Sequence, residues 1–274
     1  MLKKFSPIVN LPSLKDIWTS LEKREQFIIF SLLFGLGSYL IFLLPSCFVL
    51  AGIVSFSTVI FLFSFLMLRE VKEGFNILLL LPLLFVLSTS FVRYFYPYLS
   101  LPFRLVYVGM VTVVFYLLLL SLNIFFVVMR RGKIPLLRPA KAGLFFTVVV
   151  ISFFNFNLLF KVFSVLWMQI VFCFLVSSFL GLLFFSGMRV GEGRDFGFQY
   201  RAALVLSLQM VEICFALGFL PLEDFSRALG LAVVFYAFLG IGRDYVQHRL
   251  NKKILLEYVL ITTAFFVGIF KFLG

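Results

Sequence analysis

The chain has 274 residues, of which 63% are hydrophobic and only 13% are charged, and its mean hydropathy is +1.13. A water-soluble domain is about half apolar and about a quarter charged, so this composition excludes a protein that folds in water. The net charge of +12 sits in short linkers between apolar runs, which leave no room for a nucleic-acid-reading domain. We therefore expect a membrane protein that binds no nucleic acid and whose basic linkers meet anionic lipid headgroups.

The first 26 residues form a polar segment ahead of the apolar part of the chain. Apolar residues recur in it at helical spacing, with Trp18 among them and charged residues on the other faces. The pattern predicts a short amphipathic helix on the cytoplasmic membrane surface, and a solvated tail is the alternative. Because every later linker is too short for a separate domain, we expect residues 27–274 to form a single transmembrane domain.

Two apolar runs are too long to be single membrane-crossing helices. Residues 27–68 carry no charge, and residues 142–186 carry only Lys161. A helix of the first run's 42 residues would be about 63 Å long, about twice the hydrocarbon thickness. Each run therefore has to fold back on itself. Together with the remaining runs, this predicts an all-α bundle of nine spans, near residues 27–44, 47–68, 75–91, 105–129, 142–160, 162–186, 202–220, 226–241 and 254–270.

The two expected corners have different sequence signals. Pro45-Ser46 is the one turn signal inside the first run. In the second run, Asn155, Asn157 and Lys161 indicate the corner, with Lys161 extending to the outer interface.

Lys and Arg residues are divided unevenly between the two sides of the predicted bundle. When the linkers are assigned to alternate sides, 19 of the 24 basic residues fall on the side of the N-terminal segment and 5 on the other. Cytoplasmic linkers carry an excess of Lys and Arg. The count therefore predicts a cytoplasmic N-terminus and a C-terminus outside.

The main candidate for a functional side chain is Glu212, which lies about 15 Å along the span predicted at 202–220, near the bilayer midplane. A carboxyl group at this depth is costly unless it is paired, protonated or hydrated. Gln209 lies on the same helical face, and Gln169 and Asn123 on other spans are candidate partners. The alternative is a protonated Glu212 that only holds helices together.

Residue types suited to metal binding and catalysis are sparse. His248 is the only histidine, and the sequence contains neither an HExxH motif nor a CxxC pair. Cys47, Cys173 and Cys214 therefore indicate neither a zinc site nor a disulfide framework. We expect no cofactor and no metal, and a membrane-embedded enzyme ranks below the other function classes.

Residues 121–125 (SLNIF) and 133–141 (KIPLLRPAK) resemble a segment of an uncharacterised family of polytopic bacterial membrane proteins. The resemblance implies a multi-pass protein of the bacterial cytoplasmic membrane. It implies no activity and no site residue.

Two function classes follow from these observations. A non-catalytic component of a membrane complex, with a membrane-protein partner, ranks first because a partner-binding bundle needs packing and few buried polar groups. The alternative is a transporter or channel-like permease in which Glu212 and Gln209 line a proton- or cation-coupled route. Because polar lining is scarce, an apolar or lipid-like cargo would suit such a transporter better than a polar solute.

Overall fold

The computed structural model describes residues 22–68, 77–96, 98–131, 136–190, 196–247 and 249–272, and within them every regular element is a helix. Hydrocarbon offers no hydrogen-bond partners to the backbone, and a helix satisfies its backbone N–H and C=O groups internally. In chain order the elements are α2 (Lys23–Leu43), η1 (Ser46–Phe48), α3 (Val49–Leu68), η2 (Ile77–Leu80), α4 (Leu81–Ser90), α5 (Val92–Phe95), α6 (Leu101–Arg131), α7 (Leu137–Val162), α8 (Leu166–Arg189), α9 (Phe196–Gly218), α10 (Asp224–Val246) and α11 (Lys252–Phe272).

Seven segments of the described chain are long and apolar enough to cross a membrane. They comprise α2, η1 with α3, and the five helices α6 to α10. The third predicted span corresponds to the shorter apolar stretch Ile77–Ser90, and the ninth to α11. The described part of the chain is therefore a helical membrane bundle with seven candidate spans, and the count of nine remains a prediction.

Both predicted corners are present: the first lies where the sequence predicts it, and the second lies a few residues after its predicted place. α2 ends at Leu43, and Leu44 and Pro45 are extended before α3 begins. Asn155, Asn157 and Lys161, in contrast, all lie inside α7, and the chain turns at residues 163–165. These polar residues do not end the helix. The Asn155 amide donates to the carbonyl oxygen of Ile151 at 2.8 Å and to the hydroxyl of Ser88 on α4 at 2.7 Å, so it contributes to packing between helices rather than to a turn.

Helix ends differ from the predicted boundaries at other places too. α2 begins at Lys23, inside the segment predicted to lie on the membrane surface, while residues 1–21 lie outside the described part. α7 begins at Leu137, ahead of the predicted 142, and α10 continues to Val246, past the predicted 241. Charged residues had set the predicted ends, and several of them are helical.

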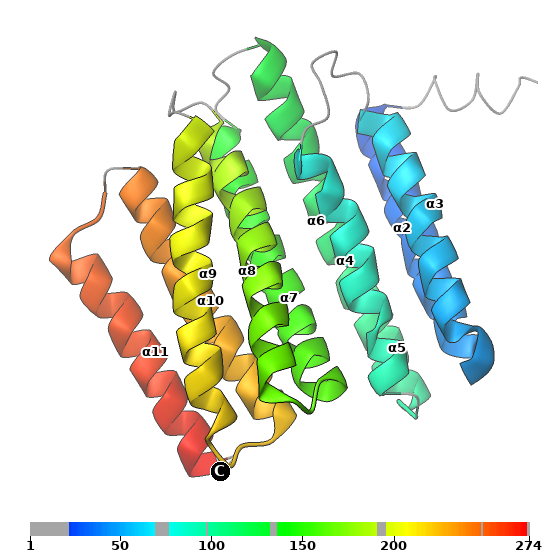
Figure 1. Cartoon of the computed structure of the whole chain (residues 1–274). Coiled ribbons are helices and arrows are strands. Elements are labelled where there is room, and N and C mark those ends of the chain that lie inside the picture. The colour runs from blue at the N-terminus through cyan, green and yellow to red at the C-terminus, as the bar shows by residue number, and fades with distance from the viewer. Residues whose placement is uncertain are drawn as a thin grey trace, which may run out of the picture.

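Successive spans run in opposite directions, so their ends gather at the two ends of the bundle (Figure 1). α2, α7, α9 and α11 begin at the upper end in that view, and α6, α8 and α10 begin at the lower end. α2 and α3 form one edge of the bundle and α11 the other, with α4 and α6 to α10 between them. This is the alternation on which the count of basic residues depends.

Phenylalanine rings hold the first helices together. The Phe34 ring of α2 stacks on the Phe115 ring of α6 at 4.3 Å, and the Phe85 ring of α4 lies 5.8 Å from Phe115. All three side chains are fully buried. Large apolar side chains also cover the outside of the bundle, for example Leu32 and Val106. An apolar outer surface indicates that lipid, rather than water, surrounds the helices.

The seam between α8 and α9 is built from small residues. Cys173, Ser177 and Gly181 are spaced four apart on α8 and are buried. A Cβ atom on Gly181 would lie 3.4 Å from the Cα of Ala203, so the two backbones approach closely. Small residues permit such approach between membrane helices. One face of α9 is thereby used for packing, and its opposite face points away from α8.

Candidate functional site

Glu212 and Gln209 lie on the outward face of α9 and are both exposed. Their neighbours on this face are apolar, with Leu208 and Phe215 50% and 44% exposed. Within the described part of the chain, Glu212 has no hydrogen-bond or ion-pair partner. A polar pair on an exposed apolar surface of a candidate span is a functional-site candidate by default.

The structure does not bring the other two predicted residues to this pair. Gln169 is buried at the start of α8, where its Nε2 donates to the carbonyl oxygen of Phe163 at 2.7 Å and closes the turn after α7. Asn123 is half-buried on α6, a helix that packs on α2, α4 and α7, whereas α9 packs on α8 and α10. Of the four candidates, only Glu212 and Gln209 share a surface.

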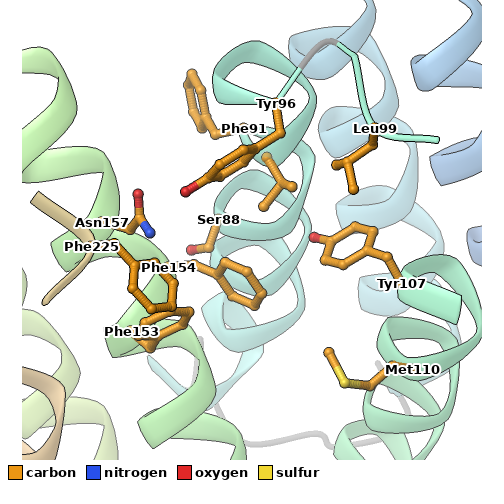
Figure 2. Close-up of a pocket in the computed structure, with 11 residues that line it drawn as sticks. Ser88, Phe91, Tyr96, Leu99, Tyr107, Met110, Phe153, Phe154, Asn157 and Phe225 are labelled. Atoms are coloured by element: carbon orange, nitrogen blue, oxygen red, sulfur yellow. The ribbon is translucent and has the colours of Figure 1, made fainter. Parts of the chain in front are cut away.

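A cavity of about 310 Å³ lies between α4, α5, α6 and α7, and Phe225 of α10 completes its wall (Figure 2). α5 lies at the lower end of the bundle in Figure 1. Its walls are mostly aromatic and aliphatic, a composition typical of sites for apolar ligands. Neither Glu212 nor Gln209 lines it. The lining residues are Ser88, Phe91, Val92, Tyr96, Leu99, Tyr107, Met110, Phe153, Phe154, Asn157 and Phe225.

Two of the polar side chains in the cavity wall are satisfied by the protein itself. The Tyr107 hydroxyl donates to the carbonyl oxygen of Thr89 at 2.8 Å. The Ser88 hydroxyl donates to the carbonyl oxygen of Leu84 at 2.6 Å and accepts from the Asn155 amide at 2.7 Å. These bonds tie α4 to α6 and α7, and they keep the wall in place.

Asn157 differs from these two residues. It is 7% exposed, and its Oδ1 atom is buried without a hydrogen-bond partner among the described residues. In Figure 2 the Tyr96 hydroxyl points toward Asn157 at the rim of the cavity. One turn further along α7, the Lys161 ammonium lies 4.7 Å from the centre of the Tyr96 ring. The rim therefore combines an unsatisfied acceptor with a positive charge.

Sequence reasoning missed a polar cluster at the other end of the bundle. Arg243 Nε donates to Asp244 Oδ1 at 3.0 Å, and Arg243 Nη2 donates to the Tyr258 hydroxyl at 3.2 Å. The Tyr258 hydroxyl donates to Asp244 Oδ2 at 3.3 Å. The Arg243 guanidinium also lies over the Phe145 ring at 5.3 Å. These contacts join α7, α10 and α11, and they fix the position of the last helix.

Lys141, predicted to lie in a basic linker, is buried within α7 and 5% exposed. Its Nζ donates to the carbonyl oxygen of Met188 at 2.8 Å, one residue before α8 ends. A cation at this place satisfies a terminal carbonyl and opposes the negative end of the helix dipole. The sequence gives no sign that Lys141 is buried or that Arg243 and Asp244 form a cluster. Both places adjoin basic linkers, in which charged residues are expected to be solvated.

Within the described residues, no three His, Cys, Asp or Glu side chains lie close enough together to hold a metal ion. His248, the Gly-rich residues 191–193 and the linker residues 132–135 lie outside the described part. The fold and the apolar surface of the described residues define a helical integral membrane protein. No family model matches the chain, and no similar curated protein or solved structure was found.

Proposed function

We propose that this protein is a non-catalytic component of a membrane complex and that it binds a partner through the outward face of α9. The observation that supports the proposal is the position of Glu212 and Gln209, which are exposed on an apolar face and do not line the cavity. A carboxyl group facing hydrocarbon is costly, and a partner helix with a hydrogen-bond donor or a positive charge at the same depth would offset that cost.

The proposal includes the arrangement in the membrane. Nine spans, with the N-terminus in the cytoplasm and the C-terminus outside a bacterial cytoplasmic membrane, agree with the alternation of helix ends (Figure 1). The ends with 19 basic residues would then meet the anionic headgroups of the inner leaflet.

A transporter that uses Glu212 is the second candidate function. It requires a route along which Glu212 lies, and the cavity between α4 and α7 receives no residue from α9. The observed geometry therefore favours partner binding over a Glu212-coupled route.

The test places a photo-crosslinking amino acid at Leu208, next to the polar pair, in protein expressed in its native membrane. A crosslinked product with a different protein is expected, and Glu212→Leu should remove it without lowering expression. The matched controls are the same crosslinker at Val106, which is exposed on α6, and Glu257→Leu, an exposed acid on α11. The crosslinker at Val106 should not give this product, and Glu257→Leu should leave the Leu208 product unchanged.

Two outcomes would contradict the proposal. One is a product with the mass of two copies of this 31.5 kDa chain, which would make the face a homodimer contact. The other is a Leu208 crosslinker that yields only lipid adducts. Loss of uptake in Glu212→Gln at normal expression would favour the transporter.

A further inference from the structure

The cavity between α4 and α7 has the properties of a binding site rather than of a packing defect. At about 310 Å³ it lies at the lower end of the volume range of ligand pockets, which is about 300–1,000 Å³. Its walls combine many apolar side chains with a few polar ones. A mostly apolar cavity of this size suits a hydrocarbon chain.

The polar group of the ligand is indicated by Asn157. Its Oδ1 is buried and lacks a donor within the described chain, and the side chain is more than nine-tenths buried. A buried acceptor is destabilising until a donor reaches it. A ligand occupying the cavity would supply that donor best as a hydroxyl group placed next to its hydrocarbon chain.

The charge of the ligand is indicated by Lys161. This residue is exposed one helical turn beyond Asn157, towards the end of α7, and its ammonium lies against the Tyr96 ring. Because the Tyr96 ring lines the cavity, the Lys161 charge lies beside the cavity, where it attracts an anionic head. The order from inside to outside is therefore apolar wall, hydrogen-bond acceptor and cation.

We propose that this cavity binds a single-chain anionic phospholipid, with the acyl chain between α4 and α7. The glycerol hydroxyl donates to Asn157 Oδ1, and the phosphate lies beside the Lys161 ammonium. The site is independent of the proposed docking face, because α9 contributes no residue to the cavity.

The test uses purified full-length protein in dodecyl maltoside and two probes with the same acyl chain. These are myristoyl lysophosphatidylglycerol, which is anionic, and myristoyl lysophosphatidylcholine, which is zwitterionic. Native mass spectrometry counts the lipids that remain bound. One molecule of the anionic probe should be retained preferentially, by about two- to five-fold, as expected for an exposed charge pair.

Three variants test the three parts of the site. Lys161→Gln should remove the preference for the anionic probe, while the acyl chains of both probes still bind. Asn157→Leu, which keeps the side-chain size, should weaken both probes by about two- to ten-fold. Val92→Phe fills the cavity and should abolish retention, whereas Val171→Phe, the same change at an exposed position of α8, should retain the probe.

The proposal fails if both probes bind equally to the unaltered protein, or if Val92→Phe retains the anionic probe as well as Val171→Phe does. Thermal unfolding verifies that each variant is folded. If Val92→Phe does not fold, Met110→Phe fills the cavity from α6, with Met168→Phe on the surface of α8 as its control. Unchanged retention in Met110→Phe would then refute the site.

Discussion

Gly181 offers a direct test of the close packing between α8 and α9. A substitution there changes both the helix propensity and the crowding between the helices, and a matched glycine elsewhere can separate the two effects. A Cβ added there would lie 2.8 Å from Leu206 Cδ2 and 3.4 Å from the Cα of Ala203. Alanine needs only the flexible end of Leu206 to move. Valine adds two more methyl groups between the helices, and we expect Gly181→Val to lower the free energy of unfolding by about 1–3 kcal/mol, the usual cost of overpacking.

Gly109 on α6 provides the matched control, since a Cβ atom there meets nothing within 4 Å. Gly109→Val makes the same change in intrinsic helix propensity, so any difference between the two variants measures crowding alone. The assay is unfolding in mixed micelles of dodecyl maltoside and increasing dodecyl sulfate. Gly181→Ala should fall between the unaltered protein and Gly181→Val. If Gly181→Val is as stable as Gly109→Val, the seam does not have the close packing described above.

Two further predictions concern the last helix and the orientation. Tyr258→Phe removes the hydroxyl that bonds to Arg243 and Asp244. We expect the free energy of unfolding to fall by about 1–3 kcal/mol and proteolysis near α11 to become faster. Unchanged proteolysis would contradict the anchoring role. Cys47 is exposed in η1, which joins the end of α2 to the start of α3 on the side predicted to lie outside. A membrane-impermeant maleimide should therefore label it in intact cells and should not label Cys47→Ser. Labelling only after permeabilisation would reverse the proposed orientation.

Part of the candidate site could be predicted from the sequence. Glu212 and Gln209 do share a face of α9, because residues three apart in a helix lie on the same side. Their outward direction could not be predicted. The spans are apolar on every side, so the sequence lacks the polar stripe that identifies the exposed face of a helix in water. The direction depends on the small residues of α8, including Gly181, against which α9 packs.

The polar residues at the cavity are a second case in which the sequence does not predict the role of a side chain. Asn155 and Asn157 resemble turn residues in the sequence, yet the first bonds to Ser88 on α4 and the second faces the cavity. Polar side chains among apolar ones signal either a turn or a buried site. Only the neighbouring helices determine which of the two is formed.

The composition and the lengths of the apolar runs were sufficient to establish a helical membrane protein, and Pro45 was sufficient to locate its first corner, because hydrocarbon admits few backbone structures and its thickness limits each span. Tertiary structure alone decided that Lys141 of α7 bonds to the last turn of α8, that Tyr258 anchors α11 to α10, and that a cavity lies beside Asn157. These features arise from contacts between helices distant in the chain. In an apolar solvent, close packing and hydrogen bonds determine which helices come into contact. The periodicity of the sequence predicts neither the packing nor the hydrogen bonds.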